Sequence, residues 1–197
     1  MPKNDSGTFQ LTAAYIELLH DEGIAITWPG IEPVPHYDCI DLNRLDSAVE
    51  RPFGAGFGIE YYPSLYDKAA CLFHAFVADH IFVSGNKRTA VLVLDQFLLV
   101  NGEYLVLDNE EIKQLARDTV PEAYRARNED HKTVLEKLSD LIGENSIPLA
   151  VLQPYLEVSK YEQLETAQKA ITEHPLNAAG ARPKQTRERA PFGLQLR

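Results

Sequence analysis

The stretch from Asn86 to Val100 constrains the fold of this chain most, because its apolar residues lie on nearly every side of the helix it would form. These residues are Ala90, Val91, Leu92, Val93, Leu94, Phe97, Leu98 and Leu99. Such a helix is stable only when other elements surround it, so we expect it at the centre of the fold. Asn101 and Gly102 give it a C-terminal stop. The nearly apolar run is too short to cross a bilayer, which takes about 20 residues.

Helical spacing of apolar residues recurs through the rest of the chain. It predicts further helices over 11–21, 41–50, 64–79, 109–118, 130–142 and 151–172. Gly23 would end the first of these as a C-cap, and Ser64 with Asp67 resembles a capping box. The prolines between Ile24 and His36 predict a loop. Because strand signals are almost absent, the predicted fold class is all-α.

One glycine-rich segment interrupts the helices. Between Arg51 and Tyr62 three glycines alternate with other residues, in an order that fails the GxGxxG dinucleotide fingerprint and follows no strand. We expect a glycine-hinged loop or a hairpin there.

Length and charge limit the function. The 197 residues fit one domain with an appendage. A formal charge of −10 argues against broad electrostatic binding to nucleic acid or to an anionic membrane. Cys39 and Cys71 lie in no metal-binding spacing, and the first ten residues lack the apolar core of a secretion signal. We therefore expect free thiols and a cytoplasmic protein.

The chain divides into three predicted parts. Residues 1–10 form a tail, 11–172 a helical domain, and 173–197 a second tail. Prolines and glycines break all periodicity from His174 onward, where five basic residues accompany one acidic residue. This composition is typical of a disordered, solvated segment.

The chemistry concentrates between His80 and Ala90, just before the apolar helix. Gly85 lets the backbone approach a ligand closely, and the free N–H groups of a helix N-terminus bind anions. Lys87 and Arg88 add positive charge. His80 is suited to proton transfer near neutral pH. Together these groups predict transfer of a phosphate-containing group to a hydroxyl; the alternative is a capped helix start with surface cations and a structural histidine.

The segment His80-Ile-Phe-Val-Ser-Gly-Asn-Lys-Arg-Thr-Ala90 resembles the Fic signature HxFx(D/E)GNxRxxR, and most closely its death-on-curing (Doc) branch, HxFx(D)(G/A)NKRTA. Similar residues of that branch also match 45–52, 62–66, 68–70 and Asn101-Gly102, so the resemblance covers roughly 11–115. The resemblance implies an all-α Fic/Doc (Fido) fold with a small β-hairpin flap. The flap would comprise Gly54, Ala55, Gly56, Phe57 and Gly58.

The resemblance also implies roles for individual residues. His80 would deprotonate a Ser, Thr or Tyr hydroxyl of a target protein, while Gly85, Asn86 and Arg88 would hold the phosphates of ATP or another nucleotide. Lys87 would be the Doc-type cation. Family members transfer AMP or phosphate, and such a protein would be the toxin of a toxin–antitoxin pair, with an antitoxin or inhibitor as a further partner.

Ser84 departs from this pattern, because the family has Asp or Glu there to hold Mg²⁺. A neutral hydroxyl is a much weaker anchor for a hard cation than a carboxylate. We therefore expect no protein metal ligand at this position. Two alternatives stay open: a catalytically impaired Fido-fold protein that binds nucleotide or protein, and a related transfer from another donor, such as a different nucleotide or a phosphocholine-bearing one.

Overall fold

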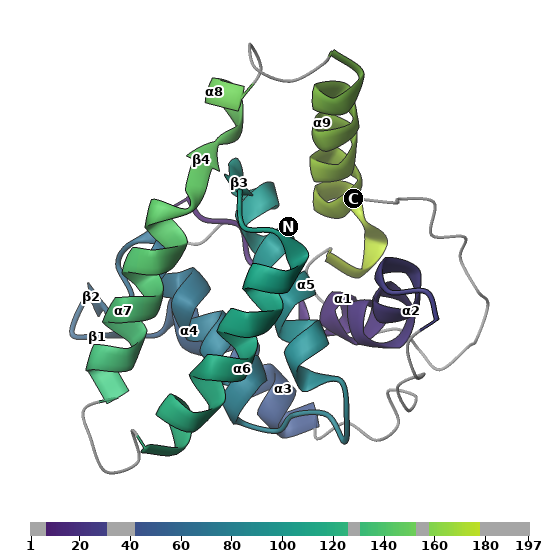
Figure 1. The fold of residues 1–197 in the computed structure, drawn as a ribbon. Helices are drawn as coiled ribbons and strands as arrows, with labels where there is room; N and C mark the ends of the chain where they lie inside the picture. Colours follow the sequence, from purple (N-terminus) through teal and green to yellow (C-terminus); the bar gives the residue numbers. More distant parts are fainter. Residues whose placement is uncertain (1–6, 31–41, 126–130, 153–157, 178–197) are drawn as a thin grey trace.

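A computed structural model describes residues 7–30, 42–125, 131–152 and 158–177, and it confirms the all-α class (Figure 1). The described helices are α1 Ala13–Leu18, α2 Ile24–Thr27, α3 Leu42–Glu50, α4 Leu65–Ala78, α5 Asn86–Val100, α6 Asn109–Arg125, α7 His131–Glu144, α8 Leu149–Leu152 and α9 Val158–Glu173. Two pairs of very short strands join them. In the described part, no helix has the length and apolar character that crossing a membrane requires.

Helix α5 occupies the centre, as its apolar faces predict. Eleven of its fifteen residues are buried, and it contacts α4, α6, α9 and the N-terminal helices (Figure 1). Leu94, Phe97 and Leu98 have no exposed surface. The helix ends at Asn101, whose side chain bonds the backbone of Phe9 in both directions, at 2.7 and 3.1 Å. The hydrophobic effect thus places α5 in the core, and the other helices cover it.

The N-terminal helix departs from the prediction. It begins at Ala13 with Thr12 as N-cap, passes through a π-helical segment, Leu19–Gly23, and continues as α2. The prediction that Gly23 ends this helix is wrong, and so is the predicted loop over 24–27. A Cβ at Gly23 would lie 3.3 Å from a methyl carbon of Leu92, so the glycine permits close packing on α5. Residues 31–36 of that predicted loop, like Cys39 and Asp41, lie outside the described residues.

The glycine-rich segment contains the predicted hairpin. A short 3₁₀ helix, η3 (Arg51–Phe53), leads into β1 (Ala55–Gly56), which pairs antiparallel with β2 (Ile59–Glu60). Phe57 and Gly58 form the two-residue turn, both with positive φ, and Phe57 is fully exposed. Buried Lys68 of α4 bonds Glu60 at 2.6 Å and also donates to the Tyr62 carbonyl. The hairpin is therefore anchored to α4 at its C-terminal end.

Helix α4 begins and ends where the sequence predicts. Ser64 and Asp67 form a complete capping box, and Asp79 is the C-cap. Helix α7 also lies within two residues of its predicted bounds, whereas α6 continues past the predicted end at Asp118 to Arg125. The helix predicted over 151–172 is divided, because α8 ends at Leu152 and residues 153–157 lie outside the described part.

Two features at the ends of elements were not predicted. Strand β3 (Glu103–Leu105), which follows α5, pairs with β4 (Ser146–Pro148), which follows α7. The pair therefore joins the chain segments that leave the C-terminal ends of these two helices. Residues 174–177, predicted as part of a disordered tail, instead contain a 3₁₀ turn, η5 (Pro175–Asn177), with Asn177 fully buried. Asn177 donates to the Ile171 carbonyl at 2.8 Å and accepts from the Thr12 backbone at 3.2 Å. This pair of bonds ties the end of α9 to the start of α1; residues 178–197 lie outside the described part.

The contact between α4 and α7 contains a buried histidine that generates a pH prediction. His74 is 5% exposed, its Nε2 has no hydrogen-bond partner among the described residues, and its ring lies 4.9 Å from that of His131. Burial, and secondly His131, lower the pKa of His74 from 6.5 to about 4. The unfolded chain therefore takes up a proton below pH 6.5 that the folded chain takes up only near pH 4, so folding stability is lost as the pH falls.

We predict that His74 alone lowers the free energy of unfolding by about 2 kcal/mol between pH 6.5 and pH 5. Urea denaturation of wild type and His74→Phe at pH 6.5 and pH 5 gives the free energy of unfolding of each protein. The contribution of His74 is the difference between the two proteins in how much that free energy falls. His131→Gln is the control and should retain most of the wild-type dependence, since burial is the larger cause. An equal pH dependence in wild type and His74→Phe would contradict the prediction.

Candidate functional site

The loop between α4 and α5 is held rigidly by buried apolar anchors. Ile81 and Phe82 are 1% and 2% exposed, so both side chains anchor the loop into the core. The Asn86 side chain closes the loop on itself: its Oδ1 accepts from the Phe82 N–H and its Nδ2 donates to the Phe82 carbonyl, both at 2.8 Å. The Asn86 side chain therefore holds the loop closed. The sequence pattern did not reveal these two hydrogen bonds.

Gly85 is the N-cap of α5 and adopts a left-handed conformation, with φ of 76°. A residue with a Cβ would be disfavoured there by about 1–2 kcal/mol. The N–H groups of the first turn of α5 have no partner within the helix and form a partial positive charge. Gly85 thus lets the chain turn sharply into a helix end that is suited to an anion.

His80 also has a positive φ, 47°, and its side chain is exposed. A left-handed conformation costs a non-glycine residue on the order of 1–3 kcal/mol, although histidine adopts it more readily than most. The residues on both sides hold it there. Asp79 caps α4 and bonds Arg51 at 2.7 Å, and Ile81 is buried. The imidazole is therefore presented at the surface between two fixed points.

A second layer of contacts lies beneath the loop, on the N-terminal helix. His20, in the π-helical segment, is 2% exposed and stacks on Phe82 with ring centroids 3.8 Å apart. Its Nδ1 hydrogen-bonds the hydroxyl of Thr89 at 2.9 Å, and that hydroxyl donates to the Gly85 carbonyl at 3.1 Å. His20 thus connects the N-terminal helix to both ends of the loop.

Sequence reasoning missed His20. A π-helical segment inserts an extra residue into a helix and often marks a functional site, but it has no signature in a single sequence.

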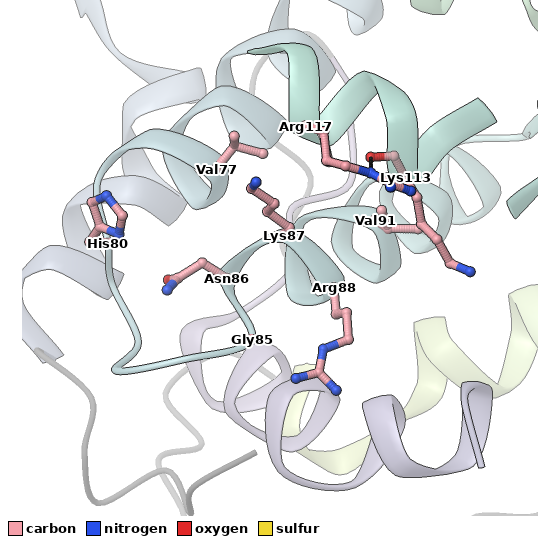
Figure 2. Close-up of a pocket in the computed structure, with 10 residues that line it drawn as sticks. Val77, His80, Gly85, Asn86, Lys87, Arg88, Val91, Lys113 and Arg117 are labelled. Carbon is pink, nitrogen blue, oxygen red and sulfur yellow. Dashed lines mark hydrogen bonds between the residues drawn. The ribbon is translucent and has the colours of Figure 1, made fainter. Parts of the chain in front are cut away.

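The loop borders a pocket of about 560 Å³ that contains all five residues predicted for catalysis and phosphate binding (Figure 2). The lining residues are Val77, His80, Gly85, Asn86, Lys87, Arg88, Val91, Lys113, Ala116 and Arg117. Figure 2 shows Lys87 and Arg88 leaving the first turn of α5 in different directions, with His80 at the opposite edge from Lys113 and Arg117. The structure thus brings the predicted residues together.

Lys113 and Arg117 of α6 were not predicted, and they double the number of cations in the pocket. Lys113 bonds Glu110 at 2.6 Å, and Arg117 lies 3.8 Å from the same carboxylate. Their i, i+4 spacing places them on one face of a helix, but nothing in the sequence shows that this face meets α5. Val77, Val91 and Ala116 supply an apolar wall beside the four cations.

The chemistry of the donors in this pocket does not fit Mg²⁺. Its lining contains four basic side chains and no carboxylate, and Ser84 is not part of it. Mg²⁺ binds through one or two carboxylates in addition to substrate phosphates. Among the described residues, no group of three or more His, Cys, Asp or Glu side chains is arranged to hold a metal ion. The same lining is well suited to a polyphosphate.

The predicted flap residues lie apart from this pocket. None of Gly54, Ala55, Gly56, Phe57 and Gly58 belongs to its described lining, and the hairpin projects at the outer edge beside α4 and α7 (Figure 1). A Cβ at Gly56 would lie 2.4 Å from the Tyr61 hydroxyl and one at Gly54 would lie 3.1 Å from the Tyr61 ring, so Tyr61 lies across both glycines. Their role as the flap that the family resemblance implies stays a prediction.

Comparisons with known proteins show what this chain is similar to. The model of the Fic/DOC family matches residues 10–98, which include the whole loop. A protein named Toxin Doc from Mycolicibacterium smegmatis (strain ATCC 700084 / mc(2)155) is 44% identical over 68 residues, which are 34% of this chain and 52% of that protein. The chain thus spans about half the length of this relative. No solved structure matches the chain.

The contacts beneath the loop generate a prediction about His20 and Thr89. His20→Phe keeps the ring stack on Phe82 but removes the bond to Thr89, and Thr89→Val removes the hydroxyl. In a double-mutant cycle we expect a coupling free energy of about 1 kcal/mol, as one buried hydrogen bond contributes. Urea denaturation of the two single variants and the double variant measures it.

Thr166→Val is the matched control, since Thr166 lies on the exposed face of α9 and its hydroxyl donates to the Glu162 carbonyl of the same helix. It should show no coupling to His20→Phe. Additive effects of His20→Phe and Thr89→Val would contradict the assigned network.

Proposed function

Because the chain belongs to the Fic/DOC family over residues 10–98, we propose that it transfers a phosphate-containing group from a nucleotide to a hydroxyl side chain of a target protein. The observation that carries this proposal is the position of His80 at the edge of a pocket with four basic side chains. A proton acceptor beside an anion-binding helix end is the combination that phosphoryl and nucleotidyl transfer need.

In the proposed reaction His80 accepts the proton of the acceptor hydroxyl while the oxygen attacks a phosphorus atom of the nucleotide. One P–O bond forms and one breaks. Attack at the γ-phosphate releases ADP and leaves a phosphate on the target, whereas attack at the α-phosphate releases pyrophosphate and leaves AMP. The imidazolium then returns its proton to the solvent. Transfer of phosphate is the Doc-like outcome, and transfer of AMP is the Fic-like one.

The remaining residues bind the negative charge of the donor. The N–H groups at the start of α5 would contact phosphate oxygens, with Gly85 allowing the close approach. Lys87 and Arg88 add charge from the same turn, and Lys113 and Arg117 add it from α6. Val77, Val91 and Ala116 offer an apolar surface for the rest of the donor. These four cations supply the positive charge for which Mg²⁺ is used elsewhere.

The biological setting is proposed from the relative's name. Toxin Doc is described as a toxin, and on that basis we propose a toxin role for this chain, a target protein in the cytoplasm, and an antitoxin as a further partner.

A nucleotide- or protein-binding protein with impaired catalysis is the second candidate. It is favoured by one observation, the neutral hydroxyl of Ser84 together with the absence of a carboxylate among the described pocket residues.

We predict that His80→Asn lowers transfer by at least roughly 100-fold, the lower range of general base catalysis, and keeps the fold. Asparagine adopts the left-handed conformation of this position readily, so the backbone is retained. ATP labelled at the α- or the γ-phosphate, incubated with the protein and an extract of the source organism, shows which group is transferred. Thermal unfolding checks the fold. Equal transfer by wild type and variant would exclude His80 as the base.

We also predict that wild type binds ATP with nearly equal affinity in Mg²⁺ and in EDTA, because its pocket contains cations in place of a metal ligand. Ser84→Asp adds a carboxylate near the N-terminus of α5, a position that the helix dipole favours, and should make ATP binding depend on Mg²⁺. Ser84→Asn is the isosteric neutral control. Calorimetric titration measures all three proteins.

Loss of wild-type binding in EDTA would contradict this prediction. Intact ATP binding with no transfer by either wild type or Ser84→Asp would favour the binding protein over the transferase.

A further inference from the structure

His80 also lines a second pocket, in addition to the cation-lined pocket. This pocket measures about 480 Å³ and lies between α3 and the end of α4. Its lining residues are Asn43, Arg44, Ser47, Arg51, Ala78, Asp79 and His80. Among the described lining residues of the two pockets, His80 alone belongs to both. A group that moves a proton thus stands where two binding spaces meet.

The geometry of group transfer assigns different partners to the two spaces. The attacking and leaving oxygens of a phosphoryl transfer lie roughly in line, on opposite sides of the phosphorus. With the donor phosphates among Lys87, Arg88, Lys113 and Arg117, the attacking hydroxyl must approach from the His80 side. The second pocket has His80 in its lining, and its volume is within the range of ligand sites.

The second pocket has a distinct charge pattern. It contains two guanidinium groups, one carboxylate and the neutral polar residues Asn43 and Ser47. Arg51 donates to a carboxylate oxygen of Asp79 at 2.7 Å, and Arg44 donates to the Asp79 carbonyl at 3.2 Å. Each guanidinium has five N–H donors in a planar fork, and these bonds orient the two groups. Positive charge exceeds negative charge in this lining.

We propose that this second pocket binds the acceptor segment of the target protein, and that Arg44 and Arg51 select a segment in which a carboxylate side chain neighbours the hydroxyl. This inference rests on the proposed function and deepens it. The carboxylate would pair with the guanidinium fork, which matches its geometry. That pairing would place the hydroxyl beside His80, which takes its proton as the O–P bond forms and the bond to the leaving phosphate breaks.

Binding of two synthetic peptides, measured without nucleotide, tests the proposal. One peptide has the sequence acetyl-Gly-Glu-Thr-Glu-Gly-amide, and the other has Gln in place of both Glu residues. Nuclear magnetic resonance follows the side-chain N–H signals of Arg44 and Arg51 and gives both dissociation constants. We expect the acidic peptide to bind about tenfold more tightly, as one charge-assisted hydrogen bond to an accessible carboxylate predicts.

Variants locate the preference. Arg44→Gln should abolish it, whereas Arg44→Lys, which keeps the charge, should retain part of it. Lys132→Gln is the matched control, because Lys132 is an exposed cation of α7 outside the lining of both pockets. It should leave the preference unchanged. Arg44 is exposed, so its replacement should not disturb the core, and thermal unfolding verifies this.

Three results would overturn the proposal: equal affinity for the two peptides, no binding of either, or a preference that persists in Arg44→Gln. Displacement of the acidic peptide by inorganic tripolyphosphate at Arg44 would also overturn it and assign the pocket to the donor. Addition of ATP distinguishes failure of the proposed peptide site from failure of the proposed transferase activity. A selective peptide complex that gains neither phosphate nor AMP by mass spectrometry supports the pocket and contradicts the transferase.

Discussion

The burial of α5 on all sides determines most of this structure. A helix with apolar residues around its whole circumference must be enclosed, and α4, α6, α9 and the N-terminal helices enclose it. Enclosure leaves the ends of the helix as the places where its unpaired backbone groups can reach a partner. At the C-terminal end, the side chain of Asn101 donates to the Phe97 carbonyl and that of Gln168 donates to the Leu99 carbonyl. At the N-terminal end the Gly85 turn opens the N–H groups to a pocket, so the candidate site follows from the packing of the core.

Local sequence signals predicted the elements whose cause is local. The capping box of α4 and the C-terminal stop of α5 each depend on residues a few positions apart, and both were predicted. The glycines of residues 54–58 predicted a loop or a hairpin, and the structure has the hairpin. Non-local causes were missed. Gly23 continues a helix because Leu92 packs against it, and β3 pairs with a strand more than forty residues later. For the same reason the motif gave His80 and the α5 cations, whereas His20 and the α6 cations depend on which helices meet.

The charge of the cation-lined pocket is opposite in sign to the net charge of the protein. The chain has a formal charge of −10, yet four basic side chains line one pocket without a carboxylate among them. Like charges so close repel one another, and Glu110 offsets this for Lys113 and Arg117 by pairing with both. A polyphosphate would offset the repulsion more fully. The concentration of positive charge on a negative protein therefore directs anions to one place.

The backbone at His80 connects the two pockets with the core. A residue in the left-handed conformation is retained only when its surroundings determine it, and here both neighbours do so: Asp79 is fixed by α4 and Arg51, and Ile81 by the core. Arg51 itself begins the hairpin segment and lines the second pocket. The same ion pair thus positions the imidazole and one wall of the second pocket. A ligand carboxylate that drew Arg51 away from Asp79 would also loosen the backbone that holds His80. Binding in the second pocket would therefore change the position of the imidazole.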